Sequence, residues 1–333
     1  MIEISIIVPV YNVENYIVRC LDSIYSQRIS IQIEVIAVND ASTDDSLKLL
    51  EEYREKQSSL IIIDKAKNEK LSKAFASGLA KAKGRYVMRI DSDDWIKENA
   101  LEILLSDINR TRADVFIFNY CISYKGYEKD SKKLIRNNLT TTDKSFVAKY
   151  FLGTAVTKLV KRELTLDMVL DKYEFNSGED LIFCAEIFLR AESFTLMEPS
   201  LYVYFYNPNS ITQTVDNKSF LDSRLFLLKV LADVKNNSLN SNLNFNKLLE
   251  NKFRNDIIRT VFKFWINNLD LSKEKLRVKS ILMNFSGFQK ETLNSIERSM
   301  TNFYCALYFM LRYNGIRQTV YALFECQSLR GRM

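Results

Sequence analysis

Two aspartates separated by one residue, Asp91 and Asp93, follow an apolar segment, 85–90, that has the composition of a buried strand. Residues i and i+2 of an extended chain project to the same side, so we expect both carboxylates to face one pocket. Such oxygens suit Mg²⁺ or Mn²⁺, which proteins hold with one or two carboxylates together with substrate phosphates. The structural alternative is that the acids of 91–94 cap a helix starting near Trp95 to Asn99.

A second pair of acids, Glu179 and Asp180, stands in the segment SGEDLIFCAEIFLRA, where apolar residues recur at helical spacing. The chain contains no histidine. This excludes an imidazole base, a Ser-His-Asp or Cys-His triad and an HExxH zinc site. Proton transfer therefore falls to carboxylates, lysine or tyrosine, and Asp180 is the candidate general base. The alternative is that these acids only begin a helix, whose dipole favours negative charge there.

The elements that must position these acids alternate between strand and helix over residues 1–94, which is typical of an α/β domain with a parallel sheet. Buried strands are predicted over 4–10, 33–38, 60–63 and 85–90, and helices over 16–24, 47–53 and 72–82. In open sheets of this kind ligands bind at the carboxyl ends of the strands. Three polar strand ends are expected to meet there: Tyr11-Asn12, Asn39-Asp40 and Asp91–Asp94.

The rest of the chain extends this domain and then changes character. A helix from Leu101 and a strand over 114–120 precede a polar stretch, 125–142, that we expect to be a surface loop or hairpin. From Phe220 onward the apolar spacing is helical. We therefore predict three parts: residues 1–98, residues 99–215 and a C-terminal helical region, 216–333.

Composition removes several classes of protein. The eight glycines form neither GxGxxG nor GxxxxGK, so dinucleotide-binding and P-loop fingerprints are absent. The five cysteines are scattered and never form CxxC, which predicts buried thiols in a reducing compartment. The longest strongly apolar run, 303–311, is too short to cross a membrane, and no signal peptide follows Met1. We therefore expect a cytoplasmic protein.

Three blocks, SIIVPVYN, VNDASTDDS and RIDSDDW, occur in that order and spacing. Together they resemble family 2 glycosyltransferases of the bacterial cell-surface polysaccharide type, over roughly residues 3–210. The resemblance implies the GT-A nucleotide-diphospho-sugar transferase fold, a Rossmann-like mixed sheet. It also implies a UDP-sugar donor and a divalent cation, Mn²⁺ or Mg²⁺. In this scheme residues 1–98 bind the nucleotide-sugar and 99–215 bind the acceptor.

The resemblance also assigns roles to residues. Asp93 would be the metal ligand, Asp180 the catalytic base and Glu179 its acceptor-side support, while Asp94 would hold its loop or cap a helix. Asp40 would hydrogen-bond the uracil. The whole nucleotide-sugar site would consist of Pro9, Tyr11, Asn12, Asp40, Asn68, Asp91 and Ser92.

One departure from the family's pattern concerns the helix over 72–82. Many relatives carry Ala-Arg-Asn-x-Gly-Leu where this chain has Ala74-Phe75-Ala76-Ser77-Gly78-Leu79. A guanidinium on the diphosphate side is therefore missing. Arg89, Lys70 and Lys73 are the candidates to replace its charge.

The hypothesis that follows is a metal-dependent inverting enzyme that moves a hexose or N-acetylhexosamine from a UDP-sugar to a hydroxyl of a growing cell-surface glycan, of capsule, lipopolysaccharide, exopolysaccharide or teichoic acid type. The alternative is a non-catalytic nucleotide-sugar or glycan-binding subunit that supports a partner glycosyltransferase, since the loss of Arg-Asn permits it. Retention of both acidic motifs argues against that alternative. Nucleic acid is not an expected partner.

The C-terminal region carries 18 basic and nine acidic residues from Phe220 onward. An apolar stripe there, Phe303, Tyr304, Leu307, Tyr308 and Leu311, is flanked by arginines. Two interpretations stay open: a helix docked on the inner face of the cell membrane, where a lipid-linked acceptor lies, or an interface in a homo-oligomer.

Overall fold

The computed structural model describes residues 2–29, 33–124, 126–130, 135–147, 154–168, 170 and 179–206. Four strands form the parallel half of one sheet, in the order β3-β2-β1-β4. They are β1 (Ile4–Val10), β2 (Ile33–Asn39), β3 (Leu60–Asp64) and β4 (Tyr86–Arg89). Helices α1 (Ile17–Tyr25), α2 (Ser46–Lys56) and α3 (Lys70–Lys81) connect them. The strand and helix order predicted for residues 1–90 is confirmed.

The other half of the sheet is mixed, as the resemblance implies. Strand β9 (Lys158–Lys161) lies antiparallel between β4 and β6 (Val115–Tyr124), and β10 (Phe194–Phe205) runs parallel to β6. Because β9 opposes both of its neighbours, β4, β6 and β10 run in one direction and end at the same edge. Three short antiparallel strands complete the described sheet: β5 (Trp95–Ile96) and β8 (Leu139–Thr141) on β10, and β7 (Tyr127–Asp130) on β6.

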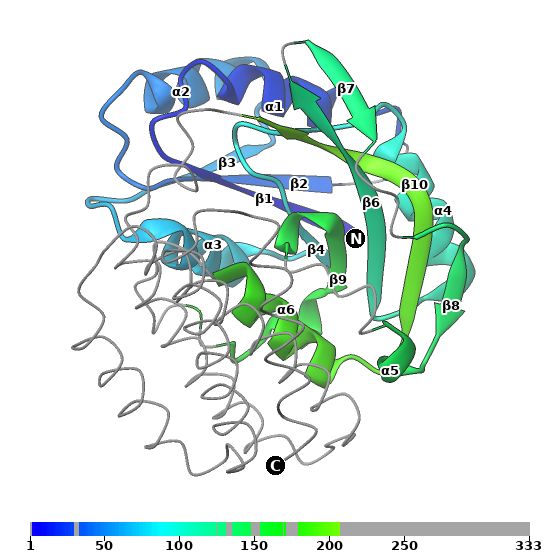
Figure 1. Ribbon diagram of the computed structural model, residues 1–333. Coiled ribbons are helices and arrows are strands. Elements are labelled where there is room, and N and C mark those ends of the chain that lie inside the picture. The colour runs from blue at the N-terminus through cyan, green and yellow to red at the C-terminus, as the bar shows by residue number, and fades with distance from the viewer. Residues whose placement is uncertain are drawn as a thin grey trace, which may run out of the picture. The chain divides into compact units, whose positions relative to one another are not determined.

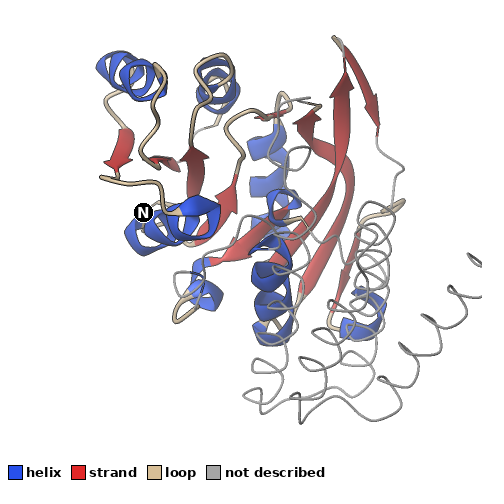
Figure 2. Ribbon diagram, turned by 60° about the vertical axis from the view of Figure 1, so that its left-hand side comes forward, coloured by secondary structure: helices blue, strands red, loops and turns tan. Residues whose placement is uncertain are grey.

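Helices cover both faces of the sheet (Figures 1 and 2). Ile6 of β1 belongs to the core that α1, α2 and α4 (Ala100–Thr111) complete, whereas Ile7 points to the other face, where it leaves no room for a Cβ at Gly78 of α3. Helix α6 (Glu179–Arg190) lies on the α3 face, because Phe75 and Phe183 make an edge-to-face ring contact at 5.2 Å. Strand alternation turns Met88 to the first face and Arg89 to the second.

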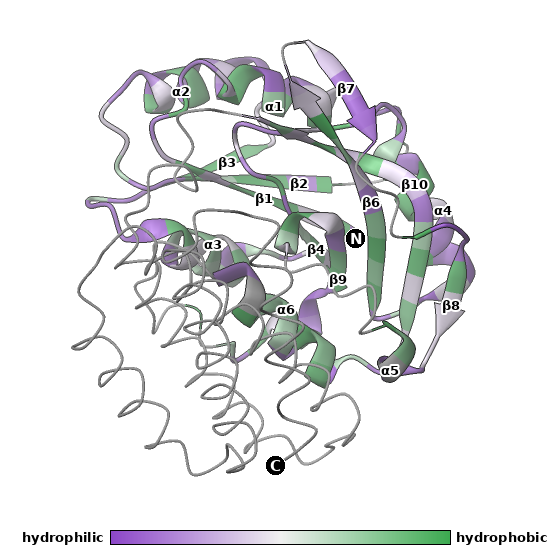
Figure 3. Ribbon diagram, in the orientation of Figure 1, coloured by the Kyte–Doolittle hydropathy of each residue, from purple (hydrophilic) through white to green (hydrophobic). Residues whose placement is uncertain are grey.

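Hydrophobic residues dominate β1, β2 and β3, while β7 is mostly hydrophilic (Figure 3). This matches a sheet buried on both faces at its centre and exposed at the β6–β7 hairpin. The polar stretch 125–142 is therefore partly strand, since β7 and β8 lie within it. Short helical turns follow at α5 (Lys144–Val147), η2 (Ala155–Thr157) and η3 (Arg162–Thr165).

The segment after the second aspartate differs from the prediction. The structural alternative for these acids was a helix starting near Trp95 to Asn99, but Trp95 and Ile96 form β5 and α4 begins at Ala100, after Asn99 in the left-handed conformation (φ 61°). Pairing with β10 outweighs the local helical preference because it joins Trp95 and Ile96 to Val203 and Tyr202. The acids of 91–94 therefore do not cap this helix.

Three cysteines, Cys20, Cys121 and Cys184, are buried thiols, as predicted for them. Cys305, Cys326 and the whole predicted C-terminal helical region lie outside the described residues. In the part of the chain that is described, none of the helices has the length and apolar character required to span a bilayer.

Candidate active site

The aspartates after β4 lie in a tight turn. The amide of Asp94 donates to the carbonyl of Asp91 at 3.0 Å. The buried Asp94 carboxylate accepts hydrogen bonds from the Tyr202 hydroxyl at 2.5 Å and from the Phe205 amide at 2.7 Å. The same hydroxyl accepts the Asp91 amide at 3.2 Å. Asp94 thus holds the loop against β10, which confirms one of its two predicted roles.

This turn corrects the reason given for pairing Asp91 with Asp93. The backbone is not extended here, because β4 ends at Arg89 and residues 92 and 93 form the turn. The Asp91 carboxylate meets Arg89, while the carbonyl of Asp93 accepts a hydrogen bond from Arg19 of α1 at 2.7 Å. The two acids of the motif are therefore held from different sides, and Ser92 between them is buried.

Arg89 joins the two acidic motifs. Its guanidinium donates from Nε and Nη2 to the two carboxylate oxygens of Asp91, at 2.7 and 3.2 Å, and from Nη1 to Oδ1 of Asp180 at 2.6 Å. Glu179 lies 3.8 Å from the same Nη1 atom. Only 3% of the Arg89 side chain is exposed. Although burial by itself lowers its pKa, the carboxylates of Asp180 and Asp91 outweigh that effect and raise the pKa well above its usual value.

The acids at the start of α6 are harder to ionise than usual. Burial and the neighbouring Asp180 charge raise the pKa of Glu179 to about 7. Burial also raises the pKa of Asp180, against the opposing effect of Arg89. Lys158 at the start of β9 is buried, donates to the Thr154 carbonyl at 2.6 Å and adds positive charge near Asp180. A carboxylate with a raised pKa is a stronger base once it is ionised.

The residues predicted to bind the nucleoside separate into two groups. Tyr11 is exposed, and the Asn12 carboxamide accepts the Thr43 amide at 2.8 Å, so both stand in the loop after β1. Pro9 lies inside β1, paired with Val38 and buried. It therefore supports the loop from below and is not part of it.

Asp40 follows β2 and is also buried. Its carboxylate accepts hydrogen bonds from the amides of Glu69 and Lys70, at 3.0 and 2.8 Å, and the Lys65 ammonium lies at 3.4 Å. Asn68 bonds the Lys70 amide through its side-chain oxygen at 3.2 Å. In the structure Asp40 thus joins the end of β2 to the start of α3. Whether it also receives the uracil hydrogen bond stays a prediction.

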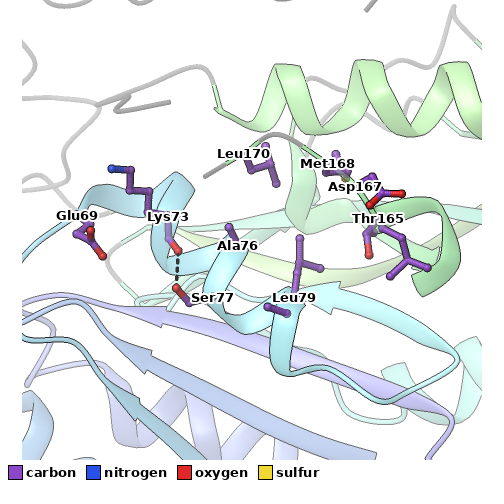
Figure 4. A pocket seen from close by; sticks show the side chains of 11 residues that line it. Glu69, Lys73, Ala76, Ser77, Leu79, Thr165, Asp167, Met168 and Leu170 are labelled. Carbon is purple, nitrogen blue, oxygen red and sulfur yellow. Dashed lines mark hydrogen bonds between the residues drawn. The ribbon is translucent and has the colours of Figure 1, made fainter. Parts of the chain in front are cut away.

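A cavity of about 530 Å³ lies beside α3 (Figure 4). Lys73, Ala76 and Ser77 line it from α3, and residues 165–168 and Leu170 line it from the segment after β9. Phe75 faces inward and packs against the Arg89 guanidinium, 5.7 Å from its ring centre. Arg89 is therefore committed to Asp91 and Asp180, and of the three candidate cations Lys73 is the one on this cavity.

The described residues fit a divalent cation in one way. They contain no group of three or more acids or cysteines that could form a complete metal cage. Arg89 engages both oxygens of Asp91, and Asp94 is buried against Tyr202. Asp93 is partly exposed in the turn and is the residue that the sequence predicts as the metal ligand. One carboxylate with substrate phosphates is a common Mg²⁺ arrangement, so the donor would have to complete the site.

Two residues of this site were not found by sequence reasoning. Tyr202 bridges Asp91 and Asp94 from 108 positions away, and Arg19 reaches Asp93 from α1. Tyr202 alternates with Tyr204 and Tyr206 along the same segment, and only the tertiary contact distinguishes it from them. Nothing in the sequence around Arg19 distinguishes it from any other exposed helical arginine.

The chain has the GT-A nucleotide-diphospho-sugar transferase fold. Three features define it: the sheet order, the acidic turn after β4 and the acidic start of α6, which Arg89 joins to that turn. The comparison with solved structures shows the same fold. The crystal structure of Staphylococcus aureus TarS 1-349 in complex with UDP-GlcNAc superposes with a TM-score of 0.66 at 21% identity, covering 100% of this chain and 93% of that chain.

Residues 5–165 of the chain match the family model described as glycosyl transferase family 2. Glycosyltransferase GlyA of Streptococcus pneumoniae serotype 4 is 34% identical over 232 residues, which are 65% of this chain and 32% of GlyA. An uncharacterized glycosyltransferase, EpsJ of Bacillus subtilis, is 29% identical over 67% of this chain and 66% of its own length. The chain thus matches about one third of GlyA and about two thirds of EpsJ.

Proposed function

We propose that this chain is a metal-dependent, inverting glycosyltransferase that moves a hexose or N-acetylhexosamine from a UDP-sugar to a hydroxyl of a cell-surface glycan. One observation carries the proposal: a single buried guanidinium binds the carboxylates of Asp91 and Asp180. The donor-side turn and the candidate base therefore lie across one arginine from each other. A donor held at the turn would present its sugar toward α6.

The names of relatives support the donor and acceptor classes. A Staphylococcus aureus relative, 28% identical over 61% of this chain, is a poly(ribitol-phosphate) beta-N-acetylglucosaminyltransferase, and a Bacillus spizizenii relative is a poly(ribitol-phosphate) beta-glucosyltransferase. Both names describe sugar transfer to poly(ribitol-phosphate). In this proposal the acidic turn after β4 binds the UDP-sugar donor, and the acidic start of α6 acts on the glycan acceptor.

In the proposed reaction Asp180 takes the proton from the acceptor hydroxyl. The acceptor oxygen forms a bond to the anomeric carbon as the bond from that carbon to the diphosphate oxygen breaks, so the configuration inverts. Arg89 fixes Oδ1 of Asp180, which orients the carboxylate before the acceptor arrives. Glu179 beside it, with a pKa of about 7, supports the acceptor side as a neutral or ionised group according to pH.

Asp93 is the proposed metal ligand, and a bound Mn²⁺ or Mg²⁺ would offset negative charge on the leaving diphosphate. Arg89 holds the Asp91 carboxylate in place, where we propose that it accepts hydroxyl hydrogen bonds from a ribose. Tyr11 and Asn12 on the loop after β1 and Asn68 before α3 complete the proposed nucleoside side.

The direct test is UDP release from a panel of UDP-sugars with Mn²⁺, with and without EDTA, against glycan and lipid-linked acceptors. We expect turnover of at least one donor and its loss with EDTA. Turnover that is unchanged in EDTA would contradict metal dependence. UDP binding without turnover of any donor would instead favour the non-catalytic binding subunit.

Location and assembly remain proposals that rest on the sequence of the C-terminal region. Its basic and apolar pattern would place the chain in the cytoplasm at the inner face of the cell membrane, or form a homo-oligomer interface. Flotation with vesicles of anionic phospholipid, compared with neutral vesicles, separates the two. Binding to the anionic vesicles but not to the neutral ones supports membrane docking. A dimer that binds neither kind of vesicle supports the homo-oligomer interface.

A further inference from the structure

Helix α1 contacts the acidic turn along one face. Residues 19 and 23 are four positions apart in α1 and so project from the same side of the helix, and Gln27 follows just after the helix ends. The Ser23 hydroxyl accepts the Ile96 amide at 3.2 Å, and the Gln27 carboxamide donates to the Lys97 carbonyl at 2.9 Å and accepts the Leu101 amide at 3.1 Å. These bonds go to backbone atoms, so they fix the course of the chain after the turn.

Arg19 extends this row to the turn itself. Its Nη2 atom donates to the carbonyl of Asp93 at 2.7 Å. Its guanidinium stacks over Trp95, 4.0 Å from the ring centre, and lies 4.5 Å from the centre of Phe205. The rings of Trp95 and Phe205 also contact each other, with their centres 6.1 Å apart. Cation–π contacts of this kind attract a guanidinium to the ring faces and hold it in one plane.

The position of this bond within the turn gives it a specific consequence. Asp91 is held through its side chain by Arg89, and Asp94 through its side chain by Tyr202. Arg19 donates to the backbone carbonyl of Asp93, so this hydrogen bond acts on the peptide of Asp93. It thereby sets the direction from which the Asp93 side chain leaves the turn.

We propose that Arg19 is a positioning residue that holds the Asp93 peptide so that the Asp93 carboxylate is directed to the cation and diphosphate of the donor. The part that concerns the donor rests on the proposed function. The part that concerns the turn rests on the contacts of Arg19 alone.

The first measurement needs no nucleotide. Hydrogen exchange of peptides covering 91–98 is compared in the wild type, Arg19→Ala, Arg19→Lys and a control, Arg85→Ala. Arg85 also pairs with an acid, Glu3, and lies over a ring, Tyr86, but at the start of β4. We expect exchange of 91–98 at least threefold faster in Arg19→Ala, an intermediate effect in Arg19→Lys and none in Arg85→Ala. Equal exchange in all four proteins would overturn the proposal.

The second measurement concerns the donor. UDP binding is measured with Mn²⁺ and with EDTA. We expect Arg19→Ala to bind UDP about tenfold more weakly with Mn²⁺ and nearly normally in EDTA, while Arg85→Ala matches the wild type in both. Methylguanidinium at millimolar concentration should take the place of the Arg19 guanidinium over Trp95 and Phe205 and restore part of the affinity of Arg19→Ala.

These outcomes are distinguishable. Faster exchange with unchanged Mn²⁺-dependent UDP binding would overturn the positioning role. A wild type without Mn²⁺-dependent UDP binding would contradict the proposed function, and the exchange of 91–98 would then decide by itself whether Arg19 holds the turn.

Discussion

Nη1 of Arg89 lies 2.6 Å from Oδ1 of Asp180, although the two residues stand 91 positions apart in the chain. The same guanidinium binds both oxygens of Asp91. Two acidic motifs that the sequence presents separately are therefore parts of one charged cluster. This cluster contains the buried cation Arg89 and three acids within its reach, Asp91, Glu179 and Asp180.

Asp180→Asn tests the base. The amide keeps the size of the side chain but cannot accept a proton, so we expect kcat to fall by about 10²–10⁴. UDP binding with Mn²⁺ should stay within about twofold of the wild type, because the donor-side turn is intact. The readout is UDP release and calorimetric UDP binding on the same preparations. A kcat within tenfold of the wild type would exclude Asp180 as the base.

Glu179→Gln tests the pH dependence of stability. The folded protein keeps a proton on Glu179 up to pH of about 7, while in the unfolded chain the group ionises near its ordinary pKa of 4.5. The folded state therefore binds more protons between these values, and the free energy of unfolding must fall as pH rises through this interval. From this shift the fall is up to about 3 kcal/mol. Urea denaturation at pH 4.5, 6 and 8 should show it in the wild type.

In Glu179→Gln the corresponding fall should be absent, because glutamine does not titrate in this range. An inflection near pH 7 in the kcat profile should disappear in the same variant. A wild type and a variant with parallel denaturation profiles would show that Glu179 ionises normally.

Arg89→Met tests the cluster as a whole. Removal of the cation leaves the acids buried without their partner, a change that costs about 3–5 kcal/mol when a buried ion pair is broken. The loss should be largest near pH 8 and smaller near pH 5, where the acids can take up protons. The control is Arg85→Met. The Arg85 side chain is 39% exposed and pairs with Glu3, and an exposed pair of this kind contributes about 0–1 kcal/mol. Equal losses for both variants would mean that Arg89 stabilises by packing alone.

Tyr202→Phe tests the support of the turn. The hydroxyl donates to Asp94 and accepts from the Asp91 amide, so its removal leaves buried polar atoms with fewer partners. A loss of about 1–3 kcal/mol is expected. Tyr127→Phe, at a ring that is 81% exposed, should change the free energy of unfolding by less than about 0.5 kcal/mol. Thermal and urea unfolding of the two variants give the comparison.

Asp93→Ala tests the metal site. The variant should need at least tenfold more Mn²⁺ for half-maximal UDP release, because one carboxylate is the protein's proposed contribution to the cation. Its free energy of unfolding should remain close to that of the wild type, since Asp93 is partly exposed. An unchanged Mn²⁺ requirement would move the metal ligand to another residue.

The strand pattern of the first 90 residues was predictable because it depends on local chemistry. Runs such as IVPV and VIAV can only be buried strands when helices flank them, and their ends carry the polar residues of the site. The helix start at Glu179 was predictable for the same reason: acids followed by apolar residues at helical spacing. The identity of the acids and the exclusion of histidine chemistry also followed from the sequence alone.

The tertiary structure decided which groups meet. Whether the Asp91 carboxylate faces a metal ion or an arginine depends on the direction of the Arg89 side chain. That direction depends on which face of β4 is covered by α6. The placement of Trp95 in β5 depends on pairing with a strand more than 100 residues later. Such contacts have no local pattern, because the energy that selects them comes from burial and hydrogen bonding between segments that the chain brings together only when it folds. Arg19 and Tyr202, which hold the acidic turn, were for this reason visible only in the structure.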